Sequence, residues 1–231
     1  MAAPEIASAL SRCILFAGLS PADLASLEAE ARVRRFRRGE VLFHQGDPGD
    51  ALFIVARGAV KISLSSDDGD EAIITTARPG EFFGELALLD GAPRSATATA
   101  LEPTETIVLS RLRFRELLAT EPALRDALFA TLARELRQLT THVQELHFLD
   151  ITGRLAARLI RLAETDGASS ADGTIRLDAP LTQGDLGSMI GATRQTVNKL
   201  LGIFVDDKLL RLDHDAIVIL DHDGLARLAR R

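Results

Sequence analysis

The sequence contains a single cysteine, Cys13, in 231 residues. One thiol excludes a disulfide within the chain and fits a reducing compartment, so we expect a cytoplasmic protein. It also excludes a cluster held by several thiolates of this chain, as iron–sulfur sites usually require. No apolar run approaches the roughly 18 residues of a membrane-spanning helix, and the N-terminus has no basic region. We therefore expect neither a membrane segment nor a secretory signal.

Two kinds of reactive group are also missing. Apart from a loose pair, His142 and His147, the histidines show no spacing typical of metal ligands, so we expect no metal site. No nucleophile, base and orienting residue form a recognisable set, which argues against an enzyme. The net charge of −6 excludes a basic coat over the whole chain. It leaves room for one local face that binds DNA, because phosphate contacts need only clustered cations.

The first half of the chain predicts short helices followed by strands. Residues 5–32 are typical of amphipathic helices, with Ser20 as an N-cap and Pro21 at the first helical position. The apolar runs that follow predict strands at 41–43, 52–55, 60–64, 72–75, 97–99 and 106–109. Turn signals separate them at 46–50, 67–70 and 78–81. Such short, regularly spaced strands indicate a small antiparallel roll or barrel.

Residues 121–149 predict one long helix, since no glycine or proline follows Pro122. A narrow apolar stripe recurs along it in steps of three and four residues, formed by Phe129, Leu132, Leu136, Leu139, Val143 and Leu146. This spacing is that of a coiled-coil seam and favours a parallel homodimer. The alternative is a helix that lies on its own domain, which normally has a wider apolar stripe.

The last third predicts a helix-turn-helix between Thr182 and Lys208. Thr182 and Thr193 are candidate caps of the two helices, and Gly191 suits the turn between them. A preceding helix is expected to begin at Asp150 or Thr152, and 166–173 is expected to be a surface loop. Strands at 175–177, 210–212 and 217–219 would form a winged sheet. The alternative is a helical hairpin in a small core.

The polar residues of this motif suit DNA. The second helix of a helix-turn-helix enters the major groove by its N-terminal end. This places Arg194, Gln195 and Lys199 toward base edges. Three threonines are expected to lie near the DNA phosphates, namely Thr182, Thr193 and Thr196.

A second candidate site lies between residues 83 and 96. Glu85 and Arg94 are nine positions apart (94 − 85), across the turn-rich segment 90–93 between two expected apolar strands. A carboxylate can accept from a ribose hydroxyl and a guanidinium can bind a phosphate bidentately, while Ser95 and nearby amides can complete an anion nest. The alternative is an exposed Glu–Arg pair on a tight turn.

Both segments resemble one family. Phe83-Gly84-Glu85-Leu86-Ala87-Leu88 and Arg94-Ser95-Ala96 resemble the phosphate-binding cassette of the catabolite activator, or cyclic-AMP receptor (Crp/Fnr), family of bacterial regulators. Segments 182–187 and 191–197 resemble the DNA-binding motif of the same family. Gln195 and Lys199 depart from it, because its type member has a glutamate and an arginine there, so the DNA half-site is left open.

The resemblance implies an α+β chain in three parts. These are a cyclic-nucleotide-binding β-roll (1–120), a dimerisation helix (121–149) and a winged helix-turn-helix (150–231). It implies an allosteric regulator that binds a cyclic nucleotide, a second copy of itself, palindromic double-stranded DNA and RNA polymerase. The nucleotide-binding residues that it implies are Gly84, Glu85, Leu86, Arg94, Ser95 and Ala96, with Thr140 and Thr141 near the base.

The sequence of the long helix does not decide whether the cyclic nucleotide carries adenine or guanine. In cyclic-AMP members of the family, a threonine followed by serine or asparagine contacts the adenine amino group. The corresponding residues here are Leu139 and Thr140, and Leu139 cannot form a hydrogen bond. Thr140 remains, with Thr141 or His142 as substitutes. We expect cyclic AMP, with cyclic GMP as one alternative and a ligand-independent regulator with a degenerate pocket as another.

Overall fold

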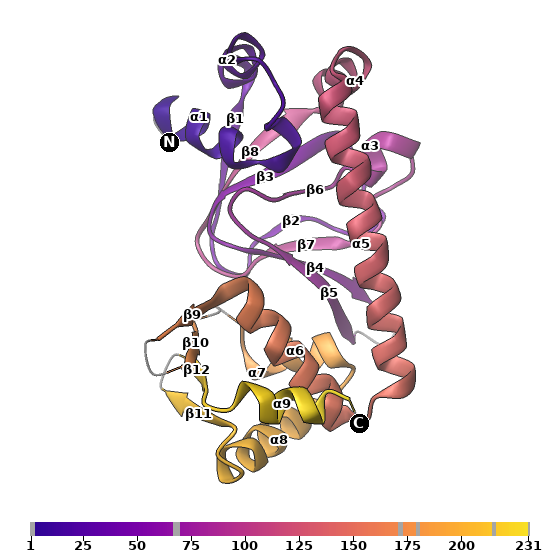
Figure 1. Ribbon diagram of the computed structural model, residues 1–231. Coiled ribbons are helices and arrows are strands. Elements are labelled where there is room, and N and C mark those ends of the chain that lie inside the picture. The colour runs from indigo at the N-terminus through magenta and orange to yellow at the C-terminus, as the bar shows by residue number, and fades with distance from the viewer. Residues whose placement is uncertain (1–2, 67–69, 171–172, 179–180, 214–215, 231) are drawn as a thin grey trace. The chain divides into compact units, whose positions relative to one another are not determined.

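The structure is a computed structural model that describes residues 3–66, 70–170, 173–178, 181–213 and 216–230 (Figure 1). It divides into two compact units, Met1–Leu136 and Arg137–Arg231. The division falls inside the long helix α5 (Pro122–Phe148), which confirms the single helix expected over 121–149. The three-part division at 120 and 149 stays a prediction. Within the described ranges, no helix is long and apolar enough to span a membrane.

The first unit is built on two antiparallel four-stranded sheets, as the strand pattern predicted. The strand order is β1-β8-β3-β6 in one sheet and β2-β7-β4-β5 in the other. The strands are β1 (Arg32–Phe36), β2 (Val41–Phe43), β3 (Ala51–Arg57), β4 (Val60–Ser65), β5 (Glu71–Ala77), β6 (Phe82–Phe83), β7 (Thr97–Ala100) and β8 (Thr104–Ser110). All six predicted strands are confirmed. The turn expected at 67–70 falls largely on residues 67–69, which lie outside the described residues.

Strand β3 connects the two cores of this unit, because successive side chains of a strand point to opposite faces. Leu52 and Ile54 pack in a cluster with the helices, whereas Phe53 and Val55 pack in a second cluster with residues of the other sheet. All four side chains are buried. Burial on both faces explains why this strand is an uninterrupted apolar run in the sequence.

Helices cover the outer face of β3 and β8. They are α1 (Ala3–Arg12), the short 3-10 helix η1 (Ile14–Phe16), α2 (Pro21–Glu30), α3 (Leu86–Asp90), α4 (Arg111–Thr120) and the first half of α5. Figure 1 shows α1, α2 and α4 gathered at one end of the roll. Ser20 caps α2 with Pro21 at its first position, as predicted. The first half of α5 is fixed to the unit by Leu124 and Leu128, each 1% exposed.

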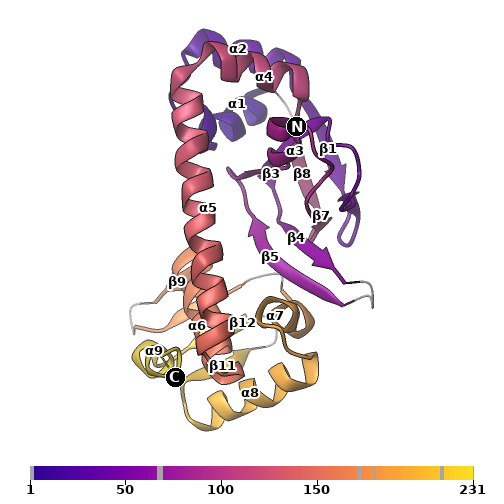
Figure 2. The same cartoon turned by 90° about the vertical axis from the view of Figure 1, so that its right-hand side faces the viewer.

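The second unit combines four helices with one small sheet of strand order β11-β12-β10-β9 in the described residues. Its elements are α6 (Ile151–Asp166), β9 (Gly167–Ser169), β10 (Ile175–Leu177), α7 (Gln183–Ile190), α8 (Arg194–Asp206), β11 (Leu210–Asp213), β12 (Ala216–Ile219) and α9 (His222–Leu228). Asp150 caps α6 by accepting from the Gly153 amide at 2.7 Å. The short turn between α7 and α8 is visible in Figure 2, and the three expected wing strands are confirmed.

The surface loop expected over 166–173 is wrong in its first part. Asp166 still belongs to α6, and Gly167–Ser169 forms strand β9 on the edge of the wing sheet. The pairing with β10 uses backbone groups, and the Ser170 amide donates to the Thr174 carbonyl at 2.9 Å. Small and polar residues carry no apolar signal for such an edge strand, so the composition did not reveal it. Residues 171–172 of this segment lie outside the described residues.

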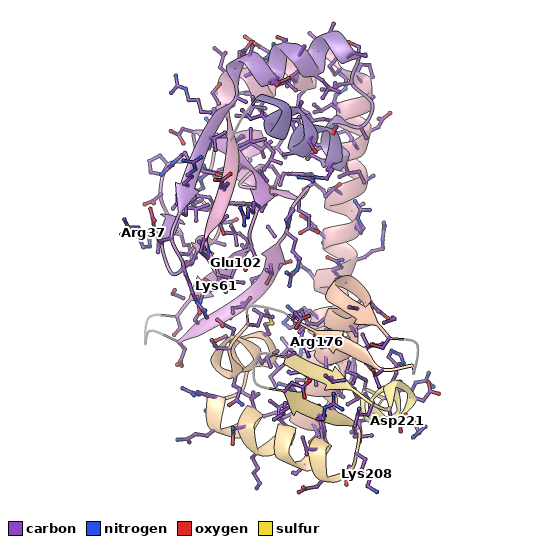
Figure 3. The ribbon with its side chains drawn as sticks, turned by 90° about the vertical axis from the view of Figure 1, so that its left-hand side faces the viewer. Arg37, Lys61, Glu102, Arg176, Lys208 and Asp221 are labelled. Carbon is purple, nitrogen blue, oxygen red and sulfur yellow. The ribbon has the colours of Figure 1, made fainter. Side chains whose placement is uncertain are left out.

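An ion pair ties the wing sheet together from one face. Arg176 on β10, labelled in Figure 3, donates from Nη1 to Asp213 Oδ2 on β11 at 3.1 Å. Because β12 lies between β10 and β11, the arginine reaches across one strand. It also pairs with Asp178 at 2.8 Å. These side chains are partly exposed, so we expect them to define the geometry of the wing more than its stability.

The packing predicts how firmly α5 is held to the first unit. Leu128→Ala should lower the free energy of unfolding by about 2–5 kcal/mol, because it leaves a cavity in the core. Leu112→Ala is the matched control on α4, where the side chain is 72% exposed, and should change it by no more than about 0.5 kcal/mol. Urea unfolding followed by circular dichroism measures both. Equal shifts in the two variants would contradict the packing.

Candidate functional site

The segment that carries Glu85 and Arg94 is a strand, a short helix and a turn. Strand β6 ends at Phe83, helix α3 follows Glu85, and Gly91 ends α3 in the left-handed conformation at φ 80°. The apolar strand expected just before the turn at 90–93 is therefore wrong for Leu86–Asp90, which form α3. These residues form a helix because the Glu85 carbonyl accepts from the amides of Leu88 and Leu89, and because Leu88 is buried.

Arg94 is the centre of this segment, and only 4% of it is exposed. Its Nη1 donates to the Gly84 carbonyl at 2.7 Å and its Nη2 to the Ala51 carbonyl at 2.8 Å. The guanidinium carbon lies 4.2 Å from the centre of the Phe43 ring, a cation–π distance. Neutral groups thus hold the cation in place.

The charge of Arg94 is left available for an anion. Its Nε is buried and has no hydrogen-bond partner among the described residues. The Asp50 carboxylate lies 3.8 Å from Nη2, and its side chain is 92% exposed, so water screens this pair. Burial lowers the pKa of Arg94, although a guanidinium stays protonated in proteins. A buried cation with a free donor is chemically suited to a phosphate.

Two glycines allow close contacts in this segment, one with Arg94 and one with α3. Gly84 has φ +84°, and a Cβ there would lie 2.5 Å from Arg94 Nη1. A Cβ on Gly49 would lie 2.3 Å from the Cβ of Ala87. Glycine is therefore required at position 84 for two reasons: the backbone is left-handed, and a side chain there would collide with the Arg94 guanidinium.

Glu85 is buried beside the arginine and is 6% exposed. Its pKa is raised from an ordinary 4.5 to about 7, chiefly by desolvation and further by Glu135 on α5. A hydrogen bond from its own backbone and the charge of Arg94 oppose this rise. A carboxyl group with this pKa changes its charge near neutral pH and can accept a hydrogen bond from a sugar hydroxyl.

The other residues expected in the cassette are less enclosed. Ala96 is buried, Ser95 is exposed, and Leu86 is 44% exposed. Thr140 and Thr141 are exposed on the part of α5 that belongs to the second unit. Thr141 donates to the carbonyl of Arg137, within its own helix. The structure therefore brings Gly84, Glu85 and Arg94 together, and nucleotide contacts by any of these residues stay predictions.

The helix-turn-helix of the second unit is held by its caps. Thr182 and Asp185 form a reciprocal capping box at the start of α7. Thr193 caps α8 by accepting from the Thr196 amide at 3.2 Å, and Gly191 adopts the left-handed conformation between the helices. The three expected roles of Thr182, Gly191 and Thr193 in the fold are confirmed.

The start of α8 presents polar side chains to solvent. Arg194, Gln195 and Lys199 are exposed, while Val197 and Leu201 anchor the opposite face of the helix in the core. The hydroxyl groups of Thr193 and Thr196 lie 3.0 Å apart, so both take part in the cap. This arrangement leaves the first turn of α8 free to enter a DNA groove.

Several residues of the two sites were not anticipated. Phe43, Ala51 and Gly49 come from segments distant from Arg94 in the sequence, and no local spacing connects them with it. In the second unit, Asn198 donates to the Gln183 side chain at 3.0 Å and so links α8 to α7. These partners depend on the tertiary fold, so a pattern of neighbouring residues could not reveal them.

The comparisons with known proteins cover most of the chain. Residues 33–121 match the cyclic nucleotide-binding domain family, and residues 153–228 match the Crp-like helix-turn-helix domain family. The CRP-like cAMP-activated global transcriptional regulator of Mycobacterium tuberculosis is 35% identical over 96% of this chain and 98% of its own. Relatives of this kind are regulators, which confirms the expectation that the chain is not an enzyme.

Two solved structures are similar as well. A CRP/FNR family transcriptional regulator from Thermus thermophilus is 28% identical, with a TM-score of 0.70 over 87% of this chain and 99% of that one. The c-di-GMP-responsive global regulator CLP of Xanthomonas campestris is 26% identical, with a TM-score of 0.72 over 83% of this chain and 94% of that one. The chain therefore belongs to the CRP family of transcriptional regulators, with a cyclic nucleotide-binding domain followed by a Crp-like helix-turn-helix domain.

Proposed function

We propose that this chain is a homodimeric, cytoplasmic regulator that binds cyclic AMP at the Glu85–Arg94 segment and palindromic DNA through α8. The observation that carries the proposal is the buried Arg94, whose guanidinium is held by two carbonyls and whose Nε lacks a protein partner among the described residues. A cyclic phosphate supplies the anion, and a ribose hydroxyl donates to Glu85. The same family membership supports RNA polymerase as a further partner.

The outer face of α5 supports the homodimer. Five apolar side chains of the expected seam are between 39% and 66% exposed in the single chain, namely Phe129, Leu136, Leu139, Val143 and Leu146. Only Leu132 packs against the core of its own unit. An exposed apolar stripe with coiled-coil spacing fits a second copy of the same helix.

Allostery requires that the nucleotide binds one conformation more tightly than another, because only a difference in affinity shifts an equilibrium between states. Arg94 and Glu85 lie in the first unit, and the start of α8 lies in the second. We propose that α5, the one helix that belongs to both units, carries this coupling.

Cyclic AMP is the first choice because the Mycobacterium tuberculosis relative is named as cAMP-activated. Cyclic GMP is the second choice, because the apolar Leu139 replaces one of the two hydrogen-bonding residues that the family resemblance leads us to expect on α5. The Thr140 hydroxyl can donate or accept, so it suits either base.

Isothermal titration tests the ligand. We expect the wild type to bind cyclic AMP more tightly than cyclic GMP or c-di-GMP. Arg94→Leu should weaken cyclic AMP binding by about 2–5 kcal/mol, because the phosphate loses a buried charge partner. Arg115→Leu removes an exposed guanidinium from α4 and is the matched control.

Three outcomes would change the assignment. Normal affinity in Arg94→Leu would place the nucleotide site elsewhere. A clear preference for cyclic GMP would replace cyclic AMP as the ligand. No heat with any cyclic nucleotide, together with full DNA binding by the free protein, would identify a ligand-independent regulator.

The raised pKa of Glu85 predicts an effect on stability in the absence of ligand. Because the folded-state pKa is about 7 and the ordinary value is 4.5, the carboxyl group stabilises the fold fully below pH 4.5. That contribution is lost as the pH rises through 7. Glu85→Gln, which cannot ionise, should therefore be more stable than the wild type by about 2–3 kcal/mol at pH 8, and no more stable at pH 4.5.

Urea unfolding at the two pH values measures this difference. Asp126→Asn, which neutralises an exposed carboxylate on α5, is the control and should show no such pH-dependent gain. An equal effect of Glu85→Gln at both pH values would mean that the carboxyl group is not destabilised by burial.

The exposed start of α8 predicts base reading. Arg194→Ala should weaken binding to the cognate palindrome by about 1–3 kcal/mol and affect random DNA much less, since base contacts specify and phosphate contacts position. Lys208→Gln removes a cation just beyond the other end of α8 and is the control (Figure 3). Fluorescence anisotropy at fixed salt measures both. Equal losses on the two DNAs in Arg194→Ala would argue against base readout.

A further inference from the structure

Asn198 on α8 carries an exposed amide group that the proposed function does not use. Its Nδ2 donates to Oε1 of Gln183, the first residue of α7, at 3.0 Å. Asn198 is exposed and Gln183 is half-buried. Among the residues that the structure describes, neither side chain has another hydrogen-bond partner. The two amides therefore form an isolated pair at the surface of the helix-turn-helix.

Asn198 lies on the face of α8 that carries the proposed base-contacting residues. It follows Arg194 by four positions and Gln195 by three, and these spacings place side chains next to one another on a helix. Lys199 follows Gln195 by four positions and lies on the same face. All four side chains are exposed, whereas Val197 between them is buried. Asn198 therefore belongs to the exposed face of α8, whose first turn is free to enter a DNA groove.

The hydrogen bond from Asn198 to Gln183 contributes little to holding α7 and α8 together. The helices are already in close contact at their turn, because a Cβ on Gly187 would lie 2.5 Å from the Ala192 carbonyl oxygen. The Ala192 amide also donates to the Gly187 carbonyl at 3.0 Å. A bond between two neutral amides at the surface adds little to this, since both groups can bond to water instead. Its main effect is to fix the orientation of the Asn198 amide.

The Asn198 amide keeps the groups that are needed to recognise a base. An asparagine amide has two N–H donors and an acceptor oxygen, and Gln183 takes one donor. The oxygen can accept from N6 of adenine while the remaining N–H donates to N7, which is a bidentate contact in the major groove. A side chain that is already oriented loses less conformational freedom when it makes this contact. The chemistry therefore indicates an adenine.

The helix geometry also predicts where this adenine lies in the half-site. Arg194 is suited to guanine. The four residues from Arg194 to Asn198 span about 6 Å along the helix axis, which corresponds to about two base-pair steps of ~3.4 Å. The adenine should therefore lie within about two base pairs of the guanine that Arg194 contacts.

We propose that Asn198 is a further specificity-determining residue of α8 that selects an adenine in each half-site, and that Gln183 is a positioning residue that orients it. This inference rests on the proposed function, because it assumes that α8 contacts bases in the major groove. It adds one amide to the contacts already assigned to Arg194, Gln195 and Lys199. It also gives α7 a part in sequence recognition.

DNA binding by the full chain in the presence of cyclic AMP tests the inference. Selection from a randomised DNA library first defines the half-site, and fluorescence anisotropy at fixed salt then measures affinity. In the wild type, replacing the selected adenine by another base should weaken binding about tenfold to a hundredfold. In Asn198→Ala the same replacement should have little effect. Arg194→Ala removes a different contact and should keep the adenine preference.

Chemically altered DNA separates a direct contact from an effect of DNA shape. 7-Deazaadenine pairs with thymine but lacks the N7 acceptor, so it removes one of the two expected hydrogen bonds. At the selected position it should weaken binding by the wild type about threefold to tenfold. Binding by Asn198→Ala should not change.

Two variants test the positioning role of Gln183. Gln183→Ala removes the acceptor and should reduce the adenine preference. Gln183→Glu keeps an acceptor oxygen for Asn198 and should retain the preference, although its charge weakens binding to every DNA. Both should unfold at nearly the same urea concentration as the wild type, because this surface bond contributes little to stability. Asp206→Asn changes an exposed side chain at the far end of α8 and is the matched control, with an unchanged preference.

An undiminished adenine preference in Asn198→Ala would overturn the inference, and so would equal losses on cognate and random DNA. Equal binding of the wild type to adenine and 7-deazaadenine, or selection of another base at this position, would overturn the adenine contact. A full preference in Gln183→Ala would overturn the positioning role. If Arg194→Ala relaxes one position of the half-site and Asn198→Ala relaxes none, only this inference fails. If the wild type binds no DNA sequence selectively, the proposed function fails with it.

Discussion

The first unit depends on the burial of one guanidinium. Arg94 enters a region formed by three distant segments, where the carbonyls of Gly84 and Ala51 accept its hydrogen bonds and Phe43 lies against its plane. A buried cation without such partners would be strongly unfavourable. The close approach of Arg94 Nη1 therefore explains the glycine at position 84. The contacts fix the cation and leave one of its donors for a ligand.

The same region shows why binding and stability are opposed at this site. Glu85 is buried and its pKa is raised, so its ionised form is less stable in the folded chain than in water. Residues in such environments are common at functional sites, where affinity for a ligand compensates an unfavourable free state. Glu135 adds to this opposition from α5. The buried guanidinium of Arg94 is the positive charge that this segment offers to an anion.

The second unit presents polar side chains on a rigid helix, α8. Capping at Thr182 and Thr193 and the left-handed Gly191 define the angle between α7 and α8. The hydrogen bond from Asn198 to Gln183 adds a direct link between these helices. Arg194, Gln195 and Lys199 can then reach outward while Val197 and Leu201 stay in the core. The types of side chain that contact DNA are specified by the local sequence, whereas the direction in which they point is set by the packing of α8.

Much of this organisation was determined by the sequence alone. The spacing of Glu85 and Arg94, the strand pattern, the long helix and the caps at Ser20, Asp150, Thr182 and Thr193 are local signals, and local physics is enough to interpret them. The tertiary structure decided what local signals cannot contain. It placed Phe43 and Ala51 against Arg94, formed helix α3 where an apolar strand was expected, and paired β9 with β10 through backbone groups. Each of these depends on contacts between distant residues, because burial and long-range pairing are properties of the folded chain.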